Sequence, residues 1–172
     1  MMNRPFNLKS LAAIALVTST ILATLGSGAS AGEVDARIRS ALEQAGLKYE
    51  ITSDSDFKVL IPCRDNRTQV VLINSDTSKI NDTNLEFREV YALAYKNNSS
   101  LPADMSYKMM QESNRKKIGS WEIIKTSNGT NLVVFNAKIS ADTSSQNLAK
   151  IISSVGLVAD EMEKTITTED TF

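Results

Sequence analysis

Two short patterns in this sequence combine residue types and spacings that catalysis can use. Ser113 and Lys116 have the Ser-x-x-Lys spacing of a serine nucleophile, and Lys125-Thr126-Ser127 weakly resembles the Lys-Thr-Gly element that accompanies it. The Ser-Asp-Asn element of such enzymes is absent, and the chain is too short for their fold. Because short patterns recur by chance, the sequence gives little support to acyl transfer.

Two groups of carboxylates are candidates for binding a cation or a partner. Asp54 and Asp56 begin as a calcium loop does, but the third ligand, the glycine and the distant Glu are missing, so we interpret them as a turn. Asp160, Glu161 and Glu163 form an acidic end to the last expected helix. We interpret this end as a solvent-facing helix surface, with a partner-binding patch as the alternative.

The sequence contains no histidine and one cysteine, Cys63. Without histidine the chain lacks the commonest general base near neutral pH and the commonest metal ligand. Cys63 continues the alternation of Phe57, Val59 and Ile61, so we expect a buried, inert thiol. The sequence therefore predicts no catalytic residues, no metal site and no cofactor, with an enzyme that uses carboxylates alone as the less favoured alternative.

The first 31 residues have the pattern of an export signal. Basic residues without acidic ones precede the apolar run Leu11–Leu25, and small residues follow at Ala29 and Ala31. The run is short for a membrane span, which needs ~20 predominantly apolar residues. We therefore expect cleavage between Ala31 and Gly32, no stable membrane anchor afterwards, and a periplasmic or secreted protein; an uncleaved anchor is the alternative.

Removal of the first 31 of the 172 residues leaves 141, a length typical of one domain. Of the 19 basic residues 17 remain, against 20 acidic ones, so the net charge becomes −3. No basic stripe is present, and the composition predicts no nucleic-acid partner. We expect one domain over residues 32–164 and a polar tail over residues 165–172 that has little to pack with.

Hydrophobic spacing gives the expected elements of this domain. Apolar residues at helical spacing predict three helices, and β-branched or alternating segments predict the strands between them. The expected helices cover residues 34–45, 101–113 and 143–164, and the expected strands cover residues 49–52, 57–61, 69–73, 85–95, 121–126 and 132–139. The fold class is α+β, an antiparallel sheet of about five to six strands with helices packed on it in the order α-β-β-β-(β)-α-β-β-α.

Three local features of these elements are specific enough to test. Asn128-Gly129 predicts a type I′ hairpin turn, and Thr143 with Gln146 has the spacing of a capping box. In the strand over residues 85–95, one face is expected to carry Leu85, Phe87, Tyr91, Leu93 and Tyr95, although Glu89 interrupts it and a helix is the alternative.

Two surfaces are candidate binding sites. Ile124, Leu132 and Val134 lie on the sheet face that the main core does not need, which favours a protein partner. The alternative is a small-ligand pocket between the sheet and the methionine helix, around Met105, Tyr107 and Met109.

Several segments resemble the YbjN domain family, whose fold is like that of type III secretion chaperones. These segments are Ala41–Glu50, Val90-Tyr91, Ile118–Glu122 with the hairpin after it, and Leu157–Glu163. The resemblance implies the same fold and carries no catalytic signature. Together with the missing catalytic groups, it favours an exported, non-enzymatic bacterial protein that binds another protein in a chaperone-like or regulatory role; the oligomeric state stays open.

Overall fold

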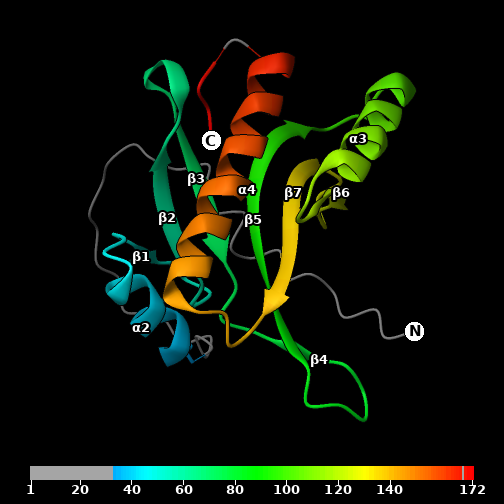
Figure 1. Ribbon diagram of the computed structural model, residues 1–172. Coiled ribbons are helices and arrows are strands. Elements are labelled where there is room, and N and C mark those ends of the chain that lie inside the picture. The colour runs from blue at the N-terminus through cyan, green and yellow to red at the C-terminus, as the bar shows by residue number, and fades with distance from the viewer. Residues whose placement is uncertain (1–32, 168) are drawn as a thin grey trace, which may run out of the picture.

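The computed structural model describes residues 33–167 and 169–172, which form one antiparallel sheet with three helices (Figure 1). The predicted α+β class and the order of helices and strands are confirmed. The described elements are, in chain order, α2 (Ala36–Gln44), β1 (Glu50–Ile51), β2 (Phe57–Pro62), the 3-10 turn η2 (Arg64–Asn66), β3 (Thr68–Ile73), β4 (Ser78–Lys79), β5 (Glu86–Asn97), α3 (Ala103–Arg115), β6 (Ser120–Lys125), β7 (Asn131–Ser140) and α4 (Ser145–Ile166).

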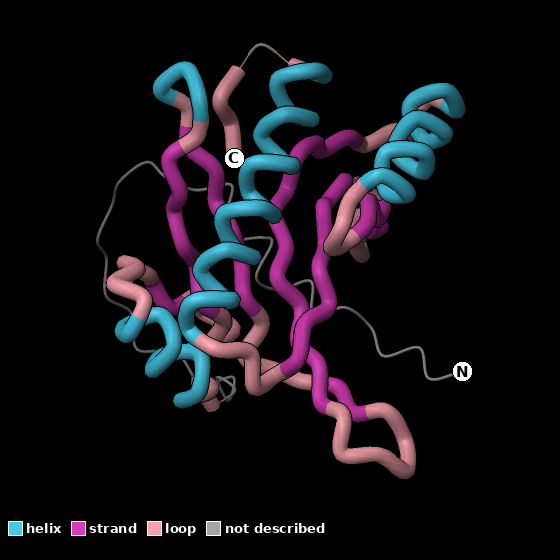
Figure 2. Tube along the Cα trace, in the orientation of Figure 1, coloured by secondary structure: helices cyan, strands magenta, loops and turns pink. Residues whose placement is uncertain are grey.

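The sheet has the strand order β1-β2-β3-β5-β7-β6, and β4 pairs with the start of β5. The two-residue strands β1 and β4 bring the number of strands to seven. The long strands β5 and β7 pair along most of their length at the centre of the sheet (Figure 2). The strand β4 lies between the expected strands over residues 69–73 and 85–95, where the sequence predicted no strand.

The main core lies between the sheet and the helices α2 and α4. Ile152, Val155 and Ala159 on α4 are fully buried against it. Gly156 allows an especially close approach, because an added Cβ atom there would lie 2.9 Å from a methyl carbon of Val71. The close packing of α4 explains why an apolar stripe runs along a helix of this length.

Both ends of α2 follow from side-chain and backbone chemistry. The carboxylate of Asp35 accepts a hydrogen bond from the N–H of Arg37 at 2.8 Å and caps the helix, which begins at Ala36 and not at residue 34 as expected. Gly46 follows the last turn with a φ of 68°, the left-handed conformation that commonly ends a helix. At α4 the expected cap was wrong by one residue, since the Ser144 hydroxyl accepts from the N–H of Asn147.

The hairpin between β6 and β7 differs from the predicted type I′ turn. Gly129 has a φ of 86°, but Asn128 is not among the described residues with positive φ, as a type I′ turn would require. The N–H of Gly129 donates to the carbonyl of Thr126, and the N–H of Thr126 donates to the carbonyl of Thr130. These bonds describe a type I turn followed by a left-handed glycine, a three-residue hairpin loop.

Strand alternation divides the apolar residues between the two faces of the sheet. The β7 side chains that belong to the main core are Val133, Phe135, Ala137 and Ile139. Leu132 and Val134 lie on the other face, as predicted. On β5, the prediction that Tyr91, Leu93 and Tyr95 share one face was partly wrong. A bulge between Leu93 and Tyr95 shifts the register, so Tyr91 and Leu93 lie on the second face while Tyr95 packs against the main core.

No helix within residues 33–167 and 169–172 combines the length and apolar character needed to cross a membrane. The expected signal and its cleavage point between Ala31 and Gly32 lie outside the described residues.

Candidate functional site

The second face of the sheet carries a continuous apolar cluster, which we call the second cluster. It contains all three residues predicted to form a partner-binding face, together with side chains from β3 and β5. Its members are Leu72, Tyr91, Leu93, Ile124, Leu132 and Val134. They are 0–9% exposed. Among the described residues, Val70 and Phe172 are the further apolar side chains packed against them.

The described helices pack against the main core and not against the second cluster. Ile38 of α2, Met109 of α3 and Ile152 of α4 all belong to the main core. Of the described segments, the chain after α4 brings an apolar side chain, Phe172, to the second cluster. The second cluster is therefore a second, buried hydrophobic layer that is separate from the main core.

Polar side chains border the second cluster toward one end of β5, β6 and β7. Lys138 lies 3.1 Å from a carboxylate oxygen of Glu122 and 3.5 Å from one of Glu89. The amide of Asn136 donates to the other oxygen of Glu122 at 3.2 Å. Glu89, which interrupted the predicted apolar face, thus contributes to a polar border beside an apolar centre.

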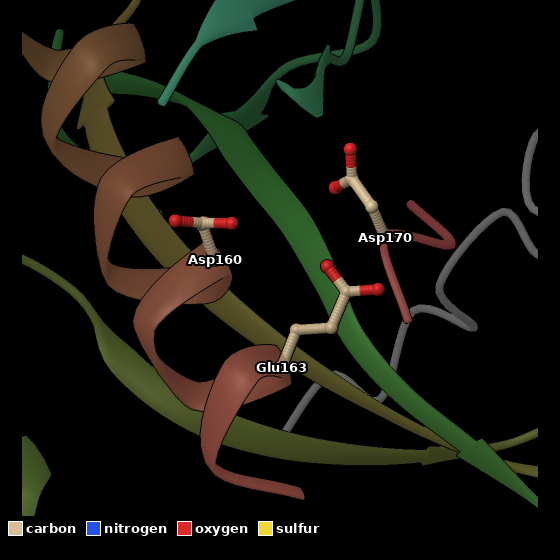
Figure 3. Close-up of side chains that lie close together, drawn as sticks. All are labelled: Asp160, Glu163 and Asp170. Atoms are coloured by element: carbon tan, nitrogen blue, oxygen red, sulfur yellow. The ribbon is translucent and has the colours of Figure 1, made fainter. Parts of the chain in front are cut away.

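A cluster of buried charges lies where α4 meets the start of β3. The guanidinium of Arg67 donates to Asp160 at 2.6 Å and to Glu163 at 3.0 Å, and it lies 3.6 Å from Asp170. Figure 3 shows the three carboxylates converging, two from α4 and one from the chain that follows it. Arg67, Asp160 and Glu163 have side chains that are 11%, 6% and 0% exposed.

The same cluster holds the end of the chain against the sheet. The carbonyl of Glu169 accepts a hydrogen bond from Arg67 at 3.1 Å, and the N–H of Thr171 donates to Glu163 at 2.7 Å. The N–H of Val70 then donates to the carbonyl of Phe172 at 2.9 Å. The expectation that residues 165–172 have little to pack with is therefore wrong for the end of this segment, because a buried ion pair and a strand provide its partners.

Burial changes the acidity of two groups at this site. Burial raises the pKa of the Glu163 carboxyl, and the hydrogen bond from Thr171 and the charge of Arg67 offset part of that change. Burial, together with the carboxylates of Asp160 and Asp170, raises the pKa of the Cys63 thiol to about 11. Cys63 is partly buried against the main core, so the expected inert thiol is consistent with its surroundings.

The three carboxylates have the spacing of a cation site, since one oxygen of each lies within 4.8 Å of the others. Arg67 supplies a positive charge at this position, with two of its nitrogens bonded to oxygens of Asp160 and Glu163. The guanidinium bonds directly to Asp160 and Glu163, and the backbone N–H groups of Thr171 and Thr68 donate to Glu163 and Asp170. We therefore interpret the cluster as an internal ion pair that fastens the end of the chain.

The interpretation of the acidic helix end as solvent-facing was thus wrong for two of its three residues. Asp160 and Glu163 are buried, whereas Glu161 is exposed. A signal was present in the sequence, because Glu163 lies four residues after Ala159 and so falls within the apolar stripe of the helix. Arg67 carried no such signal, since its partners are 93 and 96 residues away in the chain.

The predicted serine–lysine pattern has a structural role here. The Ser113 hydroxyl donates to the carbonyl of Met109 at 2.9 Å and accepts a hydrogen bond from the N–H of Trp121 at 2.9 Å. It thereby ties the end of α3 to the start of β6. Lys116 lies 4.0 Å from Glu112 on the preceding turn.

The Asp54–Asp56 segment forms a turn, as interpreted from the sequence. The Asp56 side chain is buried and accepts a hydrogen bond from the N–H of Ser75 at 2.8 Å. The Ser75 hydroxyl donates to the carbonyl of Ser55 at 2.5 Å. These bonds fasten the turn before β2 to the loop after β3.

The residues of the alternative small-ligand pocket do not share one environment. Met109 is buried in the main core, whereas the Tyr107 side chain is 64% exposed. A small hollow lies elsewhere, between α2 and β7, and has room for little more than one water molecule. Arg37 and Arg88 line it.

Those two arginines belong to a second charge cluster around the start of α2. Arg88 is 2% exposed and donates to Asp35 at 2.7 Å, and Arg37 donates to Glu86 at 3.0 Å. Hydrogen bonds from Arg37 and Thr77 lower the pKa of the Glu86 carboxyl to about 2. This cluster joins α2 to β5 and has paired charges, which is typical of a structural network.

Comparisons with known proteins found no match to this chain among family models, curated proteins or solved structures.

Proposed function

We propose that the chain is an exported, non-enzymatic protein that binds another protein through the second sheet face. The observation that carries this proposal is the second cluster, an apolar layer opposite the described helices with a polar border. An apolar centre with a polar rim is the anatomy of protein–protein interfaces. The resemblance to the YbjN domain family and to chaperone-like folds supports the same role.

The proposed export determines where this face would meet its partner. Cleavage between Ala31 and Gly32 would leave a mature chain in which, of the described residues, Val70 and Phe172 are the apolar side chains lying against the second cluster. Contiguous apolar surface on a soluble protein marks interaction sites, and Leu60, which pairs with Val70 and is 60% exposed, extends this face to the molecular surface. The mature protein is thus proposed to meet its partner after export, in the periplasm or outside the cell.

A protein partner suits this face better than a small ligand. The second cluster is spread over β3, β5, β6 and β7, whereas small-ligand sites are concave and enclose most of the ligand surface. The hollow between α2 and β7 is too small for such a ligand. A broad apolar layer is better matched by an apolar surface of another protein.

The proposal is tested by capture from the exported fraction with the unaltered protein and with Leu132→Glu. We expect the unaltered protein to retain a specific partner that the variant loses, because a carboxylate cannot be buried in an apolar interface without a large cost. Ser154→Glu, on the exposed side of α4, is the matched control and should retain the partner. N-terminal sequencing of the exported form should begin at Gly32.

Two results would contradict the proposal. One is equal capture by the unaltered protein and by a Leu132→Glu variant with an unchanged circular dichroism spectrum. The other is an exported form that retains Met1, which would refute the processing step. If Leu132→Glu does not fold, Leu60→Glu tests the same face at an edge position where the native side chain is 60% exposed.

A further inference from the structure

The sheet opens where β3 and β5 separate. Their pairing covers Val71–Ile73 of β3 opposite Val90–Ala92 of β5, although β3 begins three residues earlier, at Thr68. Beyond this point β5 bends at its bulge between Leu93 and Tyr95. The residues Thr68–Val70 therefore have β2 on one side and no described strand on the other.

The end of the chain occupies this opening, as Figure 1 shows between β3 and α4. Asp170 accepts a hydrogen bond from the N–H of Thr68 at 3.3 Å, and the carbonyl of Phe172 accepts one from the N–H of Val70 at 2.9 Å. The two contacts advance by two residues on each segment, so residues 170–172 run parallel to β3. They satisfy the backbone donors that β5 leaves unpaired.

The contacts of this tail define what the opening recognises. The backbone donors of β3 and the Arg67 guanidinium favour a carboxylate at the position of Asp170. The buried Glu163 oxygen accepts a backbone N–H one residue later, at Thr171. The second cluster then accepts a large apolar side chain at the position of Phe172.

We propose that this opening is a binding site for an extended peptide segment of a partner protein, with an acidic residue two positions before an aromatic one. The inference rests on the proposed function, because the opening leads directly onto the second cluster. Residues 170–172 occupy the site in the absence of the partner and act as an internal competitor. Addition of an extended segment beside a free strand edge is a recurring mode of peptide recognition.

The internal competitor sets a requirement on the partner. A tethered segment acts at an effective concentration in the millimolar range, so a free peptide of the same sequence competes poorly with it. A partner segment that displaces the tail must gain contacts that three residues do not make. Leu60, which pairs with Val70 on this face and is 60% exposed, offers one such contact.

The test uses the full chain with Asp170→Asn and Phe172→Ala combined, which weakens the internal competitor. The probe is a fluorescein-labelled synthetic peptide with the sequence of residues 166–172, and binding is followed by fluorescence anisotropy. We expect the double variant to bind the peptide at least tenfold more tightly than the unaltered chain does. A control peptide with Asn and Ala at the positions of Asp170 and Phe172 should not bind.

Glu169→Gln is the matched protein control. It removes one negative charge beside Asp170, and Glu169 contacts Arg67 through its backbone carbonyl. This variant should behave like the unaltered chain. Hydrogen exchange at the N–H of Val70, expected to be at least tenfold faster in the double variant, reports whether the opening has been freed.

Several results of this test would overturn the proposal. A freed opening that does not bind the peptide, or an unchanged exchange rate at Val70, overturns the proposal. Dimers of the unaltered chain that disappear in the double variant would assign the opening to the tail of a second copy and also overturn it. If the double variant fails to fold, Phe172→Ala alone leaves the Arg67 cluster in place and is judged by the same criteria. Failure here leaves capture through Leu132 unaffected, so it can be distinguished from failure of the proposed function.

Discussion

Replacement of Arg67 by alanine tests whether the buried charge cluster holds α4, β3 and the end of the chain together. Arg67 bonds to Asp160 at 2.6 Å and to Glu163 at 3.0 Å, and the two carboxylates are 6% and 0% exposed. Removal of one partner of a buried ion pair leaves the other charge uncompensated, at a cost of about 3–5 kcal/mol. We expect Arg67→Ala to lower the free energy of unfolding by that amount at pH 8.

The pH dependence gives this prediction a second, independent check. Burial already raises the pKa of the Glu163 carboxyl, and loss of the Arg67 charge would raise it further. A carboxyl whose pKa is raised by folding binds its proton more tightly in the folded state, so the folded variant is stabilised as the pH falls toward the unfolded pKa of Glu163. The cost of Arg67→Ala should therefore be smaller at pH 5 than at pH 8.

Urea unfolding followed by circular dichroism at the two pH values measures both effects. Arg39→Ala, an exposed arginine on α2, is the control and should change stability little. Addition of Glu163→Gln to Arg67→Ala should recover part of the loss, because it removes the uncompensated charge. A cost below about 1 kcal/mol at pH 8, or the same cost at both pH values, would refute the reasoning about burial.

Three further predictions concern the hairpin, the thiol and the charges near α2. Gly129→Ala should lower the free energy of unfolding by about 1 kcal/mol because Gly129 has a positive φ, whereas Asn128→Ala should lower it less. Equal losses in thermal unfolding would indicate a type I′ turn, which needs positive φ at both residues. Cys63, with its pKa of about 11, should react with a thiol reagent far more slowly in the native protein than in urea, and equal rates would contradict its burial. The pKa of Glu86 is lowered to about 2, so its ionised carboxylate should stabilise the folded protein fully above pH 4.5 and lose this effect as the pH falls through about 2. Glu86→Gln should therefore lower the free energy of unfolding near pH 7 but not near pH 2. The same loss at both pH values would contradict the ion pair with Arg37.

The fold was predictable because local patterns agree with the tertiary structure. The alternation on β7 and the helical stripe on α4 each indicate the element and its buried face, and Gly46 indicates the end of α2. The predictions that were wrong are those that a shift of one residue along a strand or helix reverses. The bulge after Leu93 reverses the face of Tyr95, and no residue type in β5 announces a bulge.

The candidate site was predictable in part. Ile124, Leu132 and Val134 lie in one cluster, as strand alternation indicated. The Arg67 cluster and the docking of Phe172 were not predictable, because both depend on contacts between segments about a hundred residues apart. The contact between Val70 and Phe172 is made by backbone groups, which nearly every residue has, so the sequence does not indicate it.

The most direct test of the central claim is a site-specific crosslink on the second sheet face. A photoreactive amino acid at Leu60, which lies beside Val70 on that face and is 60% exposed, should form an adduct with the captured partner. The same amino acid at Ser154, on the exposed side of α4, should form none. An adduct at Leu60 alone is the result that we predict. An adduct at Ser154 without one at Leu60 would contradict binding through the second sheet face.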